Sequence, residues 1–105
     1  MAHQFRPGDR VLVVQPESYS TARLREWAQA VPDGILVGLG ELSAIRTVRR
    51  ELGDCENVLF TRGSREEIPW RDGFFTVIVD AKGGAGTPEM RRVLDPSGRI
   101  YSIQP

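Results

Sequence analysis

Short apolar runs alternate along the chain with segments of helical periodicity, and this alternation restricts the fold more than any other feature of the sequence. The predicted strands span Val11–Val14, Ile35–Leu39, Val58–Thr61, Phe74–Val79 and Ile100–Ile103. Short continuous apolar runs are typical of strands that are buried on both faces of a sheet. Because right-handed helical connections between such strands produce a parallel sheet, we expect a three-layer α/β domain with helices on both faces.

Helix boundaries between the strands carry recognisable capping residues. Ser20 and Thr21 can accept hydrogen bonds from free amides at the start of a helix whose apolar positions continue to Val31. A second helix is expected over residues 42–52, and a third begins at Thr87 and Pro88, since threonine caps and proline suits the first helical position. Residues 64–67 are expected to form at most one helical turn, and residues 95–98 a turn before the last strand.

Length and charge limit the classes of function. At 105 residues the chain has the size of one domain, so we expect a single domain over residues 1–105. Lysine plus arginine equals aspartate plus glutamate at 14 each, so no net field attracts nucleic acid or an anionic membrane. No apolar run approaches the roughly 20 residues that cross a bilayer, and a cytoplasmic location is expected.

The scarcity of cysteine and histidine excludes several kinds of site. Cys55 is the only cysteine and His3 the only histidine. An intrachain disulfide and a cysteine-based zinc site are therefore excluded, as is a histidine metal cluster. A Ser-His-Asp triad would have to use His3 in the terminal tail. We expect no metal site and assign no catalytic residue.

The chain from residue 57 onward resembles the class I S-adenosylmethionine-dependent methyltransferases. Residues 60–79, which contain IPWRDGFF, look like the family segment in which a Leu-Pro-Phe turn precedes a Phe-Asp fourth strand. Residues 89–99, EMRRVLDPSGR, are similar to the family's Arg-Val-Leu-Lys-Pro-Gly-Gly signature, and residues 8–12 to its opening strand. The resemblance implies a Rossmann-like methyltransferase fold with a mostly parallel five-stranded sheet of order 3-2-1-4-5, lacking the last two strands of the family.

The residues expected at the cofactor site depart from the family pattern. Where the family has an acidic, glycine-rich loop after its first strand, this chain has QPESY at residues 15–19, with no glycine and with a proline that lacks an amide donor. The family's acid for the cofactor ribose falls at Gly40, with Glu41 one position later, and its adenine-contacting acid falls at Ser64. Only residues 80–86 connect the fourth strand to its helix, which leaves little chain to hold a methyl acceptor.

The predicted ligand crevice lies between the first and fourth strands, because open parallel sheets bind ligands beyond the carboxyl ends of the strands where the strand order reverses. Side chains that project from these strand ends are the candidate cofactor contacts. They are Gln15, Glu17, Ser18, Glu41, Ser64, Arg65 and Asp80.

Each charged candidate has a structural alternative. Glu17 could contact a cofactor or be an exposed loop charge, and Glu41 could bind a ribose or cap its own helix. Asp80 could accept a proton, bind a cation or form a turn. Lys82, followed by GGAG, could bind a phosphate at the helix start. It could also belong to a flexible connector, since a phosphate loop places its lysine after the glycines.

The departures from the family pattern predict a degenerate methyltransferase-like domain that is non-catalytic, holds no cofactor and serves as an interaction or regulatory module. The alternative is an active S-adenosylmethionine-dependent methyltransferase, or a small nucleotide-type ligand binder, that uses the same crevice. The last strand, Arg99–Gln104, would lie at the sheet edge with unpaired amides and carbonyls. We therefore expect a homodimer through this strand or a protein partner, and neither nucleic acid nor a membrane as partner.

Overall fold

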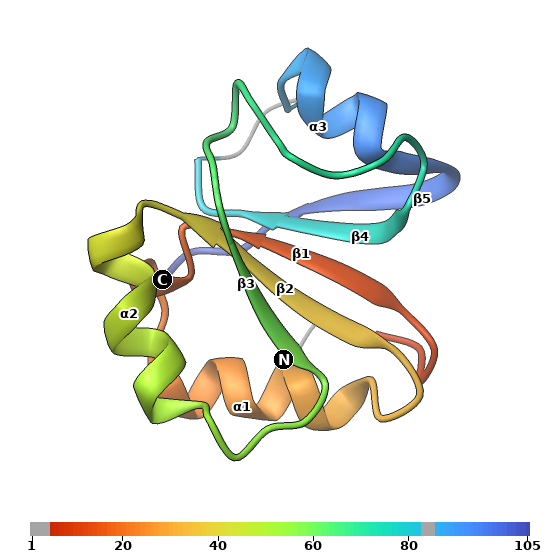
Figure 1. Ribbon diagram of the computed structural model, residues 1–105. Helices are drawn as coiled ribbons and strands as arrows, with labels where there is room; N and C mark the ends of the chain where they lie inside the picture. Colours follow the sequence, from red (N-terminus) through yellow and green to blue (C-terminus); the bar gives the residue numbers. More distant parts are fainter. Residues whose placement is uncertain (1–4, 83–85) are drawn as a thin grey trace.

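The computed structural model describes residues 5–82 and 86–105, and its strands form one sheet between two layers of helix and loop (Figure 1). The elements in chain order are β1 (Arg10–Val14), the 3-10 turn η1 (Pro16–Ser18), α1 (Thr21–Ala30), β2 (Ile35–Gly40), α2 (Leu42–Glu51), β3 (Val58–Arg62), β4 (Phe75–Asp80), α3 (Pro88–Val93) and β5 (Leu94–Ser102). The sheet order is β3-β2-β1-β4-β5, and every neighbouring pair is parallel. The predicted three-layer α/β fold and its strand order are confirmed.

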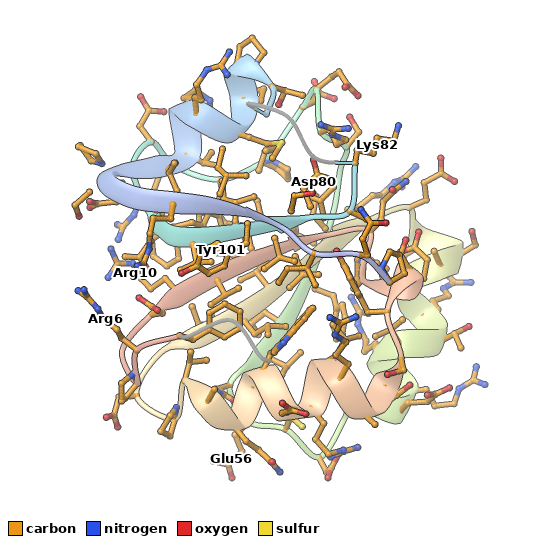
Figure 2. The ribbon with its side chains drawn as sticks, turned by 180° about the vertical axis from the view of Figure 1, so that it is seen from behind. Arg6, Arg10, Glu56, Asp80, Lys82 and Tyr101 are labelled. Atoms are coloured by element: carbon orange, nitrogen blue, oxygen red, sulfur yellow. The ribbon has the colours of Figure 1, made fainter. Side chains whose placement is uncertain are left out.

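Both faces of the central strands of the sheet are buried, as the continuous apolar runs predict. Residues 11–14 of the central strand β1 are at most 2% exposed. On one face, Trp27 of α1 and Leu52 beyond α2 belong to one apolar core. On the other face, Met90 of α3 packs with Ile68 from the loop between β3 and β4. Arg10 at the start of β1 and Asp80 at the end of β4 mark the two ends of the strands (Figure 2).

Two predicted helix starts are confirmed by their capping hydrogen bonds. The Ser20 hydroxyl accepts from the Arg23 amide at 3.2 Å, and the Thr87 hydroxyl accepts from the Met90 amide at 3.1 Å. Each side chain satisfies an amide that has no partner inside the helix. Among residues 5–82 and 86–105, the structure contains no helix that is long and apolar enough to cross a membrane.

The chain just after β3 contains a tight two-residue turn, where the sequence predicts at most one helical turn. Ser64 and Glu67 exchange backbone hydrogen bonds of 3.0 and 3.1 Å as an isolated antiparallel bridge. Ile68 follows and is only 2% exposed. Burial of this side chain draws the segment across the sheet, so the turn stays short and Arg65 lies at its tip.

The predicted turn at residues 95–98 lies inside β5 as a bulge rather than before the strand. Leu94 pairs with Phe75 and Arg99 pairs with Val77, so the intervening residues of β5 oppose a single residue of β4. Within the bulge, the Asp95 carboxylate accepts from the Ser97 amide at 2.8 Å, which is the local turn that the sequence indicates. The strand begins earlier than predicted because Leu94, which precedes the turn, already pairs with Phe75 of β4.

Helix α3 fastens the loop between β3 and β4. The Arg92 guanidinium donates to the carbonyls of Ile68 at 2.7 Å and Trp70 at 2.9 Å, and it pairs with the carboxylates of Glu89 and Asp72. Glu89 in turn accepts from the Ile68 amide at 3.0 Å. The hydrogen bond from Arg92, with a smaller contribution from the Ile68 amide, lowers the pKa of Glu89 to about 2. The same contacts raise the pKa of Arg92, so both groups stay charged.

Candidate functional site

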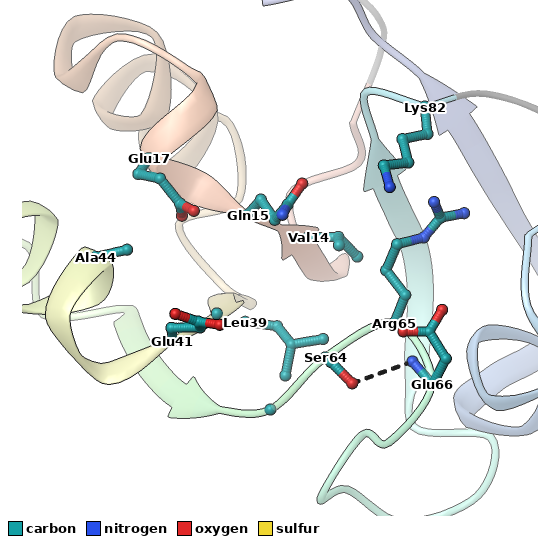
Figure 3. Close-up of a pocket in the computed structure, with 12 residues that line it drawn as sticks. Val14, Gln15, Glu17, Leu39, Glu41, Ala44, Ser64, Arg65, Glu66 and Lys82 are labelled. Atoms are coloured by element: carbon teal, nitrogen blue, oxygen red, sulfur yellow. Dashed lines mark hydrogen bonds between the residues drawn. The ribbon is translucent and has the colours of Figure 1, made fainter.

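A cavity of about 390 Å³ opens at the carboxyl ends of β1, β2 and β3, the end of the strands at which open parallel sheets bind ligands (Figure 3). The strand ends, the first turn of α2 and the chain after β3 and β4 supply its walls. The lining residues are Val14, Gln15, Glu17, Leu39, Gly40, Glu41, Ala44, Gly63, Ser64, Arg65, Glu66 and Lys82.

Most of the predicted site residues meet in this cavity. Those that line it are Gln15, Glu17, Glu41, Ser64 and Arg65. Asp80 is ion-paired with Arg65 but is not part of the lining, and Ser18 ends the 3-10 turn outside it. Sequence reasoning did not select Glu66, although its place next to Arg65 in a short turn between strands is the signal that could have identified it.

The segment that follows β1 is folded down onto β2. Gln15 has a φ of 56°, a left-handed conformation that is uncommon for a residue with a side chain. Its amide donates to the Leu39 carbonyl at 2.8 Å. The buried Pro16 packs on Gly38, where an added Cβ would lie 2.9 Å from the proline Cγ. The turn therefore fills the space above the end of β2 with its own atoms.

Two carboxylates flank the end of β2 at Gly40. A Cβ added to Gly40 would lie 3.4 Å from an Oε atom of Glu17, so the missing side chain leaves room for that carboxylate. Glu41 occupies the position before α2 but makes no side-chain capping hydrogen bond, so it does not cap its own helix. Both side chains line the cavity and are free to accept hydrogen bonds from a ligand.

A buried ion pair joins the turn after β3 to the end of β4. The Arg65 Nη2 atom lies 2.9 Å from an Oδ atom of Asp80, and the two side chains are 16% and 2% exposed. The alignment is poor, because this Oδ atom and the Arg65 Nε atom are buried without a hydrogen bond. The other Oδ atom of Asp80 accepts from the Lys82 amide at 3.2 Å, so Asp80 also forms a turn.

Arg65 is held in place through its own backbone. The Thr87 hydroxyl, which caps α3, also donates to the Arg65 carbonyl at 2.6 Å. The Ser64 hydroxyl accepts from the Glu66 amide at 3.3 Å, the contact drawn as a dashed line in Figure 3. These contacts anchor both ends of the turn, so the Arg65 guanidinium is directed toward Asp80 by a fixed backbone.

The phenol of Tyr19 lies near the same carboxylate. Its hydroxyl donates to the Ile103 carbonyl at 2.8 Å. Burial, with a smaller contribution from the negative charge of Asp80, raises the pKa of Tyr19 above its ordinary value. Tyr19 is therefore protonated near neutral pH, and its hydroxyl already donates its hydrogen bond to the backbone carbonyl of Ile103.

Among the residues that the structure describes, no group of three or more histidine, cysteine, aspartate or glutamate side chains could hold a metal ion. The segment after Lys82, for which a phosphate site and a flexible connector were the alternatives, includes Gly83, Gly84 and Ala85, which lie outside the described residues. Lys82 is described, is exposed and lines the cavity.

Solved structures of methyltransferases match this arrangement of strands and helices. No protein-family model and no curated protein sequence matches the chain. A S-adenosylmethionine-dependent methyltransferase from Aquifex aeolicus has a TM-score of 0.72 and 17% identity, over 87% of this chain and 53% of that one. The methyltransferase in a complex with the Trm112 methyltransferase activator of Haloferax volcanii has a TM-score of 0.71 and 23% identity, over 92% and 45%. The chain has the methyltransferase fold.

The methyltransferase fold accounts for where the cavity lies. This chain spans about half the length of both of those proteins. A methyltransferase from Bacillus halodurans matches in the same way, with a TM-score of 0.67 and 18% identity over 90% of this chain and 44% of that one. At the position where the resemblance places a ribose-binding acid, Gly40 has no side chain, and the Glu17 carboxylate lies beside it instead.

Proposed function

We propose that this methyltransferase-like domain does not transfer methyl groups and acts as an interaction or regulatory module. The observation that carries the proposal is the ion pair between Arg65 and Asp80. Arg65 comes from the turn after β3 and Asp80 ends β4, so the pair crosses the point between β1 and β4 where the strand order reverses. Arg65 lines the crevice, and we infer that its guanidinium takes space that a methyl donor would need.

The turn after β1 supports the same proposal. A glycine-rich loop lets the backbone approach a cofactor closely, because glycine has no side chain and keeps its amide donor. Here Pro16 has no amide to donate and its ring fills the space next to Gly38. Two separate parts of the crevice are thus filled by the chain itself.

A loop-replacement variant tests the proposal. We expect that replacing residues 15–19 with an acidic glycine-rich loop leaves the domain folded but produces no methyl transfer, because Arg65 and Asp80 still fill the crevice. The variant and the wild type are each incubated with methyl-labelled S-adenosylmethionine and a cell extract that supplies acceptors. Labelled product above the protein-free control, from either protein, would refute the proposal.

A second function is favoured by the cavity itself. Its volume of about 390 Å³ lies at the lower end of the range of small-molecule sites, about 300–1,000 Å³. Both acidic and basic side chains line it, and a regulatory module can use such a site to sense a small nucleotide-type ligand. S-adenosylmethionine is the reference ligand for any binding test, since the Aquifex aeolicus neighbour is described as dependent on it.

A protein partner is part of the proposal, and we place a homodimer contact at β5. Within the described residues β5 pairs with β4 alone, so its outer edge keeps unpaired amides and carbonyls. The chain covers part of the apolar area of this strand, because Tyr101 stacks on Phe5 with ring centroids 6.1 Å apart and Ile103 is 2% exposed. The edge, together with the partly exposed Ile100, therefore carries the proposed contact. The complex between a methyltransferase and an activator from Haloferax volcanii supports a protein partner in general.

A further inference from the structure

Two aromatic side chains meet at the surface just before β4, at the end of the sheet opposite to the cavity. A hollow of about 480 Å³, the aromatic hollow, is lined there by Pro69, Trp70, Arg71 and Phe74. The rings of Trp70 and Phe74 are partly exposed, and their planes meet at 51° with the centroids 5.6 Å apart. From this surface we propose that the domain binds a proline-rich segment of a partner protein that also carries an acidic residue. The inference rests on the proposed function, because it names a partner for an interaction module.

The aromatic rings suit the side chains of proline. Tryptophan and arginine are among the residues that contribute most to binding at protein interfaces, and the aromatic hollow contains one of each. A proline-rich segment already forms an extended left-handed helix before it binds. It therefore packs its rings on an aromatic surface at a small cost in conformational entropy.

The indole N–H of Trp70 is a donor that the chain does not use. It makes no hydrogen bond to the described residues and is not buried. The backbone amide of Trp70, by contrast, donates to the Ile68 carbonyl at 2.8 Å. The carbonyls of a polyproline helix have no partners within that helix. The indole can therefore donate to a carbonyl of the bound segment.

The charge of the aromatic hollow favours an acidic partner. Among the described residues that line it, Arg71 alone is charged. The Arg71 guanidinium lies 4.9 Å from the centre of the Phe74 ring and pairs with no described carboxylate. The adjacent carboxylate of Asp72 pairs with Arg92 at 2.6 Å instead. Arg71 is thus placed to attract a carboxylate that lies next to the proline rings.

Contacts from two sides hold this surface in place. The Nη1 atom of Arg92 donates to the Trp70 carbonyl at 2.9 Å, and the Nε atom of Arg10 donates to the Phe74 carbonyl. Arg10, labelled in Figure 2, also lies over the Phe74 ring, but its charge interacts with that of Asp95. A surface that is fixed before binding loses little conformational freedom when a partner docks. The aromatic hollow is therefore preorganised for a partner.

Two-dimensional NMR spectra of the isotope-labelled chain, titrated with short capped peptides, test the inference. The probe is Pro-Pro-Glu-Pro-Pro, and the comparison peptides are Pro-Pro-Lys-Pro-Pro and Ala-Ala-Glu-Ala-Ala. We expect the probe to bind about fivefold or more tightly than either, because lysine is repelled by Arg71 and alanine lacks the ring and the preformed helix. The indole N–H signal of Trp70 should shift on binding, whereas that of Trp27, which is 4% exposed, should not.

Two variants locate the contact. Arg71→Gln should remove the preference for glutamate over lysine, whereas Arg50→Gln, an exposed change on α2, should keep it. Trp70→Phe retains a ring but lacks the indole donor, so it should weaken the probe severalfold. The loss of one indole signal in this variant also assigns the signal of Trp70.

The possible results separate this inference from the proposed function. Equal affinity for the three peptides, a Trp70 signal that does not shift, or a charge preference that survives Arg71→Gln would overturn it. Failure of all three peptides to bind would also overturn it, but would leave the absence of methyl transfer and the contact at β5 untouched. If Trp70→Phe or Arg71→Gln converts a dimer to a monomer in sedimentation, a second copy covers this surface and the inference fails.

Discussion

Gly38 of β2 packs against Pro16, the first residue of the 3-10 turn that follows β1. A Cβ on Gly38 would lie 2.8 Å from the Phe60 ring and 2.9 Å from Pro16. Protein interiors have few voids, so an extra methyl group at such a position displaces its neighbours. The glycine is needed for the proline to lie where it does, and the proline in turn closes the segment after β1.

Gly38→Ala tests this packing at a single residue. We expect a loss of about 1–3 kcal/mol in the free energy of unfolding, because the added methyl overpacks a buried contact. Urea denaturation monitored by circular dichroism measures it. Gly8→Ala is the matched control, since nothing lies within 4 Å of the added Cβ there, and it should cost little. Equal stability of the two variants would show that Pro16 does not pack on β2.

The ion pair between Arg65 and Asp80 allows a second residue-scale prediction. Arg65→Met should destabilise the fold by about 3–5 kcal/mol, because it leaves a buried carboxylate without its counter-charge. Adding Asp80→Asn should recover much of this loss, since no uncompensated charge then remains. A double-mutant cycle compares the unfolding free energies of the wild type, both single variants and the double variant. Additive effects of the two substitutions would contradict a coupled pair.

Helix α3 is a short element that depends on the loop it fastens. It spans only Pro88–Val93, and an isolated helix of that length is unstable in water. The Thr87 cap and the contacts of Arg92 with Glu89 and the loop carbonyls stabilise this short helix. Because the same loop carries Arg65, the stability of α3 and the geometry of the cavity are connected.

The depressed pKa of Glu89 gives α3 a pH-dependent stability. Arg92 lowers this pKa from 4.5 to about 2, so the unfolded chain binds a proton at a higher pH than the folded chain does. The stabilising contribution is therefore complete above about pH 4.5 and is lost as the pH falls toward 2. Unfolding free energies measured across this range should fall more steeply for the wild type than for Glu89→Gln. Parallel curves would contradict a stabilising pair of Arg92 with Glu89. The control variant Glu56→Gln, on the exposed surface, should reproduce the wild-type curve.

Helices and strands were predictable where they depend on residues that are close together in the sequence. Strand positions follow from apolar runs, and the caps at Ser20 and Thr87 use side chains within three residues of their partners. The bulge of β5 was predicted only as a turn, because the bond from Asp95 to Ser97 is local whereas the pairing of Leu94 with β4 is not. The 3-10 turn after β1 was missed for the same reason, since it depends on Pro16 meeting β2.

The sequence predicted a crevice between β1 and β4, whereas the cavity lies at the ends of β1, β2 and β3 and includes only Lys82 from the chain after β4. The contacts inside it were not predictable. The pairing of Arg65 with Asp80 could not be derived, since it depends on how far the loop after β3 reaches across the sheet. The approach of Glu17 to Gly40 is likewise set by the fold of the turn rather than by sequence spacing.

Among the described residues β3 and β5 each pair with one strand only, so both edges of the sheet are open, and they differ in composition. β3 exposes Leu59, which is 48% exposed, whereas β5 has most of its apolar side chains partly covered. We expect sedimentation equilibrium at micromolar concentration to show a dimer of the 11.7 kDa chain, since two-fold pairing is the commonest association of soluble proteins. Ile100→Lys on β5 should dissociate it and Leu59→Lys on β3 should not. A strict monomer would refute the dimer, and the reverse response would move the contact to β3.

The central claim is that the methyltransferase fold persists while its crevice is closed to the methyl donor. Titration calorimetry of the wild type with S-adenosylmethionine and S-adenosylhomocysteine tests it most directly, because it requires no knowledge of an acceptor. The account predicts dissociation constants weaker than about 100 μM, a binding free energy smaller in magnitude than about 5.5 kcal/mol. Tighter binding of either compound would show that Pro16 and the pair of Arg65 with Asp80 leave the cofactor site open, and would contradict the claim.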